Sequence, residues 1–409
     1  MSTHSIRVLA ALAAIAALTA WLTLPVSAQQ RRDVVGYYPS YKWRPGDHGL
    51  TPREIPFDRL TIINYAFFVP LPDGTITGKD TAGDARALLG HPAKGAGDTL
   101  NVTAGDVRDN HSPSLTALAH RHGVRVLLSI GGWDDSGTFP AVASDPARRS
   151  LFSHACAGAI LRYGFDGIDI DWEYPGFEEH NGSAADSVNF PLLLGTLRDT
   201  LNRLARSLDR HLTLSAAVPA TEAHARLMAI RRSAEILDYL NVMTYDLYGT
   251  WDSRAYHNAP LFAGPGGDSA RSVDGAFRLY RETYGIPARR INLGVPFYGH
   301  TFADCPELLG THAGADTTVF AGATYANISA RAGEFVRHWD PFALVPYLTS
   351  PVRRTLVSYD DAASVRLKAE YAAAHGARGL IVWEITQDAL PDGSHPLLDA
   401  IDRVFHSLH

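Results

Sequence analysis

The chain has 409 residues, of which 46% are hydrophobic and 20% are charged. This composition is typical of a globular protein with a large core, and the length suits one large domain or two ordinary ones. The formal net charge of −6 gives no reason to expect a nucleic acid or an anionic membrane as a partner.

The first 28 residues have the pattern of an export signal. Arg7 precedes an apolar run over residues 8–24, and the small residues of Val26-Ser27-Ala28 follow it. A charged start, an apolar stretch and a small-x-small cleavage site are typical of a signal peptide. We therefore expect cleavage near Ala28 and secretion of residues 29–409, with no membrane association afterwards. A retained signal anchor is the alternative.

Eight short β-rich runs recur along the rest of the chain, and helical patterns lie between several of them. Asp145-Pro146 opens one helix, with Asp at the N-cap and Pro at the first helical position. Others are expected at 186–208, 270–284 and 361–375. Eight strands alternating with helices predict an α/β fold, the (β/α)8 TIM barrel, with a doubly wound open sheet as the alternative. The predicted strands are Val34–Tyr38, Thr61–Phe68, Arg125–Ile130, Gly167–Trp172, Leu212–Val218, Leu240–Tyr245, Ile291–Phe297 and Gly379–Trp383.

One interval departs from this alternation. Residues 298–360 carry short β-like runs, glycine clusters and aromatic residues before the next helical pattern begins. A structureless loop of this length is uncommon in a compact domain. We therefore expect a small α+β insertion domain at about 299–360, between strand 7 and strand 8 of the barrel. Residues 71–112 form a second, more polar excursion.

Cys156 and Cys305 are the chain's two cysteines. Export permits a disulfide, but the sequence does not show whether the two thiols meet. Two cysteines are too few for a zinc site of their own. We favour two buried free thiols.

The segment "DGIDIDWEYP", residues 166–175, places acids inside what otherwise has the pattern of a buried strand. Alternate residues of a strand share a face, so Asp169, Asp171 and Glu173 point one way and Trp172 points the other. In a barrel the acids project inward and toward the mouth at the carboxyl ends of the strands. Three carboxyls in a partly dry site cannot all ionise, so at least one holds a proton at neutral pH.

A purely structural role and a metal site are the alternatives for this row of acids. Acids at a strand end can cap a helix or pair with basic residues, and Asp166, which is out of phase with the other three, fits that structural role. Clustered carboxylates also suit a hard cation. The other strand ends supply aromatic and hydroxyl side chains instead of further acids, so we expect no metal and no cofactor.

The row resembles the D-x-x-D-x-D-x-E signature of glycoside hydrolase family 18, the chitinases and their relatives. The resemblance runs in order and spacing from about Val34 to His395, and further segments carry it: "LLSIGGW" at 127–133, "VMTYDLYGTWD" at 242–252, "INLGVPFYGHTF", "WDPFALVPY", "VSYDD" and "GLIVWEI".

The resemblance implies a role for each matching residue. Glu173 is the expected general acid and base, and Asp171 is expected to orient the N-acetyl group of the substrate, whose carbonyl oxygen acts as the nucleophile. Asp169 is expected to share a proton with Asp171, and Tyr245 to hold the acetamido oxygen. The expected substrate-binding residues are Asp246, Met243, Trp383, Tyr37, Ser129, Trp133 and Trp251. Of these, Tyr37 and Ser129 match positions that hydrogen-bond the inner acids in the family.

A secreted chitinase that cleaves β-1,4-linked N-acetylglucosamine polymers is the function that the resemblance implies. We expect a monomer that binds chitin or chitooligosaccharides. A non-catalytic chitin-binding lectin on the same scaffold is one alternative, and the presence of Glu173 argues against it. An endo-N-acetylglucosaminidase or a peptidoglycan hydrolase is another. The insertion argues against both of these hydrolases, since in this family it walls a deep cleft suited to long chitin chains.

Overall fold

The computed structural model describes residues 32–43, 49–90, 113–320 and 322–406. The expected signal peptide, residues 1–28, lies outside them. No helix in these four ranges is long and apolar enough to cross a bilayer.

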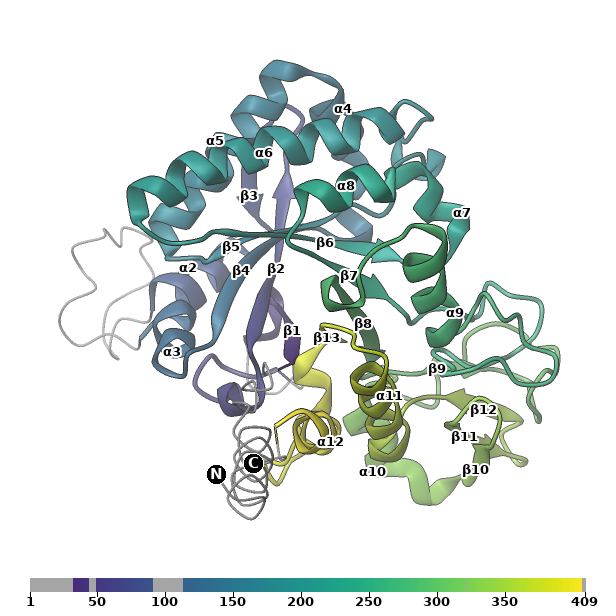
Figure 1. The fold of residues 1–409 in the computed structure, drawn as a ribbon. Coiled ribbons are helices and arrows are strands. Elements are labelled where there is room, and N and C mark those ends of the chain that lie inside the picture. The colour runs from purple at the N-terminus through teal and green to yellow at the C-terminus, as the bar shows by residue number, and fades with distance from the viewer. Residues whose placement is uncertain (1–31, 44–48, 91–112, 321, 407–409) are drawn as a thin grey trace, which may run out of the picture. The chain divides into compact units, whose positions relative to one another are not determined.

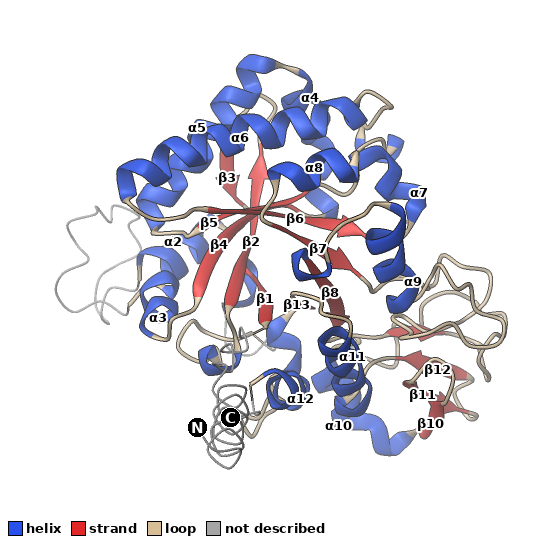
Figure 2. Cartoon of the chain, viewed as in Figure 1, coloured by secondary structure: helices blue, strands red, loops and turns tan. Residues whose placement is uncertain are grey.

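A closed barrel of parallel strands forms the body of the protein (Figures 1 and 2). Each strand pairs in parallel with the next, and β1 pairs with both β2 and β13, which closes the circle. All eight predicted strands are present within about two residues of their expected ends, and the open-sheet alternative is wrong. The barrel strands are β1 (Asp33–Pro39), β2 (Ile62–Pro70), β4 (Arg125–Gly131), β5 (Gly167–Asp171), β6 (Thr213–Pro219), β7 (Tyr239–Met243), β8 (Ile291–Pro296) and β13 (Gly379–Trp383).

Helices surround the strands (Figure 2). Two of them have an Asp at the N-cap: Asp145, the predicted cap, accepts hydrogen bonds from the backbone of the first turn of α5, and Asp361, at the start of the helix expected at 361–375, caps α11. The helix expected at 270–284 begins at Val273, because Ser272 is its N-cap, and continues as a π-helical turn over Leu279–Thr283. The helices are α2 (Thr81–Leu89), α3 (Leu115–Arg121), α4 (Phe139–Ser144), α5 (Pro146–Tyr163), α6 (Asp186–Leu208), α7 (Glu222–Ala225), α8 (Ile230–Ile236), α9 (Val273–Arg278), α11 (Ala362–Ala374) and α12 (Pro396–Phe405).

The predicted α+β insertion lies between β8 and β13. Its antiparallel strands pair in the order β10-β11-β12-β9, beside the helix α10 (Figure 1). A separate small core of Val319, Phe320, Ile328, Leu348, Val357 and Tyr359 holds it together. The elements are β9 (His300–Phe302), α10 (Tyr325–Arg331), β10 (Val336–Asp340), β11 (Val345–Ser350) and β12 (Thr355–Ser358). In the polar excursion, β3 (Ile76–Gly78) pairs antiparallel with β2.

The two cysteines are buried and free, as favoured from the sequence. Cys156 lies in α5, and the Cys305 Sγ donates a hydrogen bond to the Glu307 carbonyl oxygen in the insertion.

Candidate active site

The acidic row of β5 points into the barrel as predicted. Asp169 is fully buried, Asp171 is 3% exposed, and Glu173 follows two residues beyond the strand. Trp172 faces the helices, where its ring stacks on Phe139 at 5.2 Å. Because the barrel strands are parallel, the row rises from the barrel interior to the mouth at their carboxyl ends.

Asp166 has the structural role that its phase indicates. Its carboxylate pairs with Arg210 and with His120, and it accepts a hydrogen bond from the Val126 backbone at 2.8 Å. Asp166 therefore joins β5 to neighbouring elements and takes no part in the row.

Asp169 accepts hydrogen bonds from four neutral side chains on four other strands. Tyr37 and Ser129 donate to its Oδ2 at 2.9 Å each. Ser215 and Asn241 donate to its Oδ1 at 2.6 and 3.2 Å. Burial raises the pKa of Asp169, and these four hydrogen bonds act in the opposite direction by stabilising the anion.

Two expectations need correction here. The predicted sharing of a proton between Asp169 and Asp171 does not fit this geometry, because each Asp169 oxygen already accepts two hydrogen bonds from other donors. Tyr37 and Ser129 hydrogen-bond the inner acid Asp169, as the resemblance implied, but the expectation that they also bind substrate is wrong, because they are at most 1% exposed and do not line the cleft.

Asp171 and Glu173 each affect the pKa of the other. Burial raises the pKa of Asp171 well above its ordinary value, and the negative charges of Glu173 and Asp169 raise it further. The interaction acts in opposite directions on the two acids: Glu173 raises the pKa of Asp171, whereas Asp171 lowers that of Glu173. The Asp171 Oδ1 is buried and has no hydrogen-bond partner among the described residues.

Glu173 is half-buried, and its pKa is raised to about 7. Burial is the main cause; a hydrogen bond with Tyr174 opposes it, and the negative charge of Asp246 adds to it. A carboxyl group with this pKa keeps its proton near neutral pH and can also give it up, as a general acid and base must.

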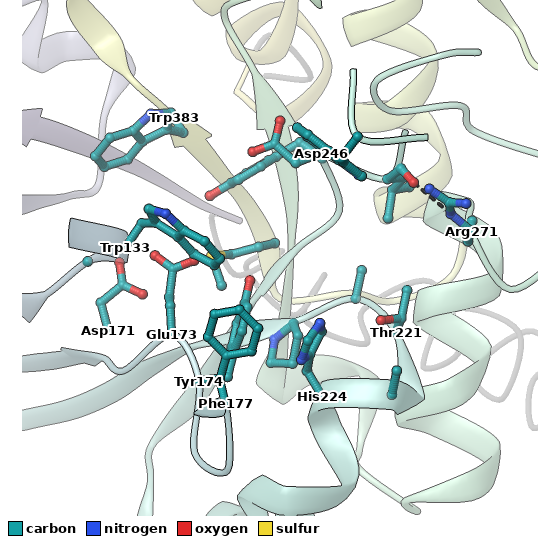
Figure 3. Close-up of a pocket in the computed structure, with 18 of the residues that line it drawn as sticks. Trp133, Asp171, Glu173, Tyr174, Phe177, Thr221, His224, Asp246, Arg271 and Trp383 are labelled. Carbon is teal, nitrogen blue, oxygen red and sulfur yellow. Dashed lines mark hydrogen bonds between the residues drawn. The ribbon is translucent and has the colours of Figure 1, made fainter. Parts of the chain in front are cut away.

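A cleft of about 1020 Å³ opens above the pair. Trp383, from the end of β13, lines it and stacks on Phe67 at 5.6 Å with 18° between the rings. Figure 3 shows Glu173 between Asp171 and Tyr174, with Trp133 close by. Trp133 and Trp251 are 51% and 62% exposed although both line the cleft, and Met243 lines it as well. Exposed indole faces of this kind suit the flat face of a sugar ring.

Tyr245 and Asp246 reach the cleft from the end of β7. Burial raises the pKa of the Tyr245 hydroxyl, and the negative charges of Asp171 and Glu173 raise it further. Tyr245 lines the same cleft as both acids. The Tyr245 ring packs so closely on β8 that a Cβ on Gly294 would lie 2.7 Å from it. Asp246 has a left-handed φ of 53°, and its backbone N–H donates to Asn258 Oδ1 at 2.7 Å.

Glycine is required where β4 meets the acidic row. Gly131 has a φ of 112°, and a Cβ there would lie 2.1 Å from the Asp171 carbonyl oxygen. The Gly-Gly pair of "LLSIGGW" therefore permits close packing at the end of the strand.

The structure adds residues to the site that the sequence did not single out. Ser215 and Asn241 are two, and their signal was a polar side chain inside a buried strand. Ser136, Asn258, His300 and Tyr174 lie in turns, loops or the insertion, where no periodicity marks them. Among residues 32–43, 49–90, 113–320 and 322–406, no three His, Cys, Asp or Glu side chains are grouped to hold a metal ion.

Known proteins with similar sequences are glycoside hydrolases. Residues 33–388 match the family described as Glycosyl hydrolases family 18. Chitinase A1 of Niallia circulans is 30% identical over 402 residues, which cover 87% of this chain and 56% of that protein. Endochitinase 1 of Metarhizium robertsii is 32% identical, over 92% of this chain and 89% of that protein.

A solved chitinase structure has the same fold as this chain. The Group IV chitinase of Ostrinia furnacalis in complex with allosamidin superimposes with a TM-score of 0.78 at 28% identity, over 92% of this chain and 99% of that one. The family match and these relatives identify a glycoside hydrolase, and the acidic row and the aromatic side chains at the mouth of the barrel fit that class. The chain belongs to glycosyl hydrolase family 18.

Proposed function

We propose that this protein is a chitinase that hydrolyses β-1,4 bonds between N-acetylglucosamine residues with retention of configuration. The observation that carries the proposal is the unpartnered Oδ1 of Asp171, a buried acceptor at the cleft beside Glu173. Buried acceptors normally have donors. The N–H of a 2-acetamido group can supply this donor, and the same group carries the carbonyl oxygen that acts as the nucleophile. A cellulose sugar has a hydroxyl group there, which can donate but offers no such nucleophile.

Each side chain of the site has a role in this reaction. Glu173 protonates the leaving glycosidic oxygen and later takes a proton from the attacking water. Asp171 binds the acetamido N–H, orients the group and stabilises the positive charge that develops on it. Tyr245 donates to the acetamido oxygen, Asp246 binds the sugar beside it, and Trp383 supports the sugar ring.

The nucleophile is the substrate's own acetamido oxygen, as membership of this family implies. A retaining enzyme with a carboxylate nucleophile needs its two carboxyls about 5–5.5 Å apart across the bond. Asp171 ends β5 only two residues before Glu173 and projects to the same side, and Asp169 is held deeper in the barrel by four donors. The row therefore offers no carboxylate for the opposite face of the sugar.

The experiment compares chitopentaose with cellopentaose, which has the same linkage but a hydroxyl group in place of each acetamido group. Proton NMR of the first products reports their anomeric configuration. We expect cleavage of chitopentaose alone, with the β-anomer formed first. Binding without cleavage would support the lectin alternative. Inert chitopentaose with cleavage of an N-glycan or of peptidoglycan would support the other alternative.

We also propose that the protein is exported and that its first 28 residues are removed. The support is the charged start, apolar stretch and small-x-small site at residues 7–28. N-terminal sequencing of protein recovered from the culture medium should begin at Gln29. A membrane-bound product that begins at Met1 would support the retained anchor.

A further inference from the structure

The backbone of Glu173 lies beyond the last rung of its strand. The ladder between β5 and β4 ends at the pair Asp171–Gly131, and the ladder between β5 and β6 ends at Ile170–Ala216. The sheet therefore holds neither peptide group of Glu173. Two side chains from two different loops hold them instead.

Ser136 holds the N–H side. It is fully buried in the turn Trp133–Thr138, which follows β4. Its hydroxyl oxygen accepts a hydrogen bond from the Glu173 N–H at 2.8 Å, and the hydroxyl donates to the Gly132 carbonyl oxygen at 2.9 Å. The turn is also tied to the strand, because the Gly132 N–H donates to the Asp171 carbonyl oxygen at 2.8 Å.

His180 holds the carbonyl side. Its Nδ1 lies 2.6 Å from the Glu173 carbonyl oxygen. A carbonyl oxygen only accepts, so Nδ1 carries the proton and donates.

The loop that carries His180 is itself anchored. Asp186 Oδ2, at the start of α6, accepts from the Gly176 and Ser183 backbones at 3.0 and 2.9 Å. Asn181 donates to the Gly137 carbonyl oxygen at 3.0 Å, which joins this loop to the turn that carries Ser136. The edge of the His180 ring also contacts Trp133, with centroids 4.7 Å apart.

We propose that Ser136 and His180 are positioning residues that fix the general acid from both sides of its backbone. The inference rests on the proposed function, because it needs Glu173 to act as that acid. Neither residue touches substrate in this scheme. Each keeps the Glu173 carboxyl in line with the glycosidic oxygen, and a misplacement of about 1 Å can reduce the rate about 100-fold.

The test uses four variants of the full chain. Ser136→Ala and His180→Phe remove the hydroxyl and the Nδ1 donor, and Phe keeps a ring against Trp133. Ser136→Thr keeps the hydroxyl, and His180→Asn keeps an N–H donor. We expect kcat on chitopentaose to fall about 10- to 100-fold in the first two variants, with KM within about threefold, and to recover substantially in the other two.

Two further readouts separate positioning from a general loss of structure. An aryl glycoside of chitobiose has a leaving group that needs little protonation, so its kcat should fall much less than that of chitopentaose. In a Glu173→Gln background, Ser136→Ala and His180→Phe should cost nothing more, because the group they position is already absent.

The outcomes distinguish the two proposals. An inert wild type would overturn the proposed function and this inference together. An active wild type whose Ser136→Ala and His180→Phe variants keep full activity would overturn the inference alone. So would equal losses on both substrates, or further losses in the Glu173→Gln background.

Discussion

His300 Nε2 lies 2.8 Å from Asp246 Oδ1, and this pair joins the insertion to the mouth of the barrel. His300 begins β9, whereas Asp246 follows β7. The His300 ring also contacts the edges of Trp251 and Tyr298, with centroids 5.4 and 5.8 Å away. The insertion therefore orients an acid that we expect to bind sugar, besides adding a wall to the cleft.

Replacing His300 by Phe should weaken substrate binding. Phe keeps a ring against Trp251 and Tyr298 but leaves Asp246 without its donor. Hydrogen bonds to charged groups contribute about 1.5–3 kcal/mol, so KM should rise about tenfold with a smaller change in kcat. His300→Gln keeps a donor and serves as the control. An unchanged KM in His300→Phe would show that Asp246 does not need this partner.

The pH dependence of kcat/KM should follow Glu173. The acid must be protonated in the free enzyme, and its pKa is about 7, so kcat/KM should fall as the pH rises through about 7. The charge of Asp246 raises that pKa, so Asp246→Asn should move the alkaline limb to lower pH. Glu222→Gln changes another acid of the cleft wall and is the matched control. A limb that stays in place or moves to higher pH in Asp246→Asn contradicts the role of Asp246 in raising this pKa.

Glu173→Gln should stabilise the fold at alkaline pH. The pKa of Glu173 is raised from its ordinary 4.5 to about 7 in the folded protein, so folding disfavours the ionised form. The stability that this group contributes is present below pH 4.5 and is lost as the pH rises to 7. The variant should therefore gain about 1–3 kcal/mol at pH 8 and almost nothing at pH 4. Urea unfolding at both pH values measures this, and equal gains at both would refute the cause.

Asp169 should matter for stability as well as for catalysis. Asp169→Ala leaves the four buried donors Tyr37, Ser129, Ser215 and Asn241 without their acceptor. We expect a loss of about 3–5 kcal/mol of unfolding free energy, which urea denaturation measures. Ser129→Ala removes one donor of the four and should cost only about 1 kcal/mol. Losses of equal size in the two variants would mean that Asp169 is not the centre of the network.

The indole ring of Trp383 should support the bound sugar by stacking against its flat face. Trp383→Ala removes the ring that stacks on Phe67, and we expect kcat/KM for chitopentaose to fall about 10- to 100-fold. Trp383→Phe keeps a smaller ring and should lose less. Melting curves check that both variants fold. An Ala variant as active as the Phe variant would show that the sugar does not rest on this ring.

The barrel and the acidic row could be predicted because both are periodic. Each barrel strand is a short apolar run between helical patterns, and Asp169, Asp171 and Glu173 fall on one phase of β5. Asp166 falls on the other phase, which predicted a structural role for it, and its pairing with Arg210 confirms that role.

The partners of the row could not be predicted in the same way. The proton sharing that the resemblance implied took no account of the donors that reach Asp169 from β1, β4, β6 and β7. The groups that hold Glu173 and Asp246 lie in loops or in the insertion. Ser136, His180 and Asn258 contact backbone groups, and such contacts leave no pattern in the sequence.

Hydrolysis of chitopentaose by wild type and by Glu173→Gln, with binding of the same oligosaccharide measured in parallel, decides whether Glu173 is the general acid of a chitinase. We expect cleavage by the wild type, a loss of about 10²- to 10⁴-fold in kcat for the variant, and retained binding. A Glu173→Gln variant that cleaves within tenfold of the wild type would contradict this role for Glu173.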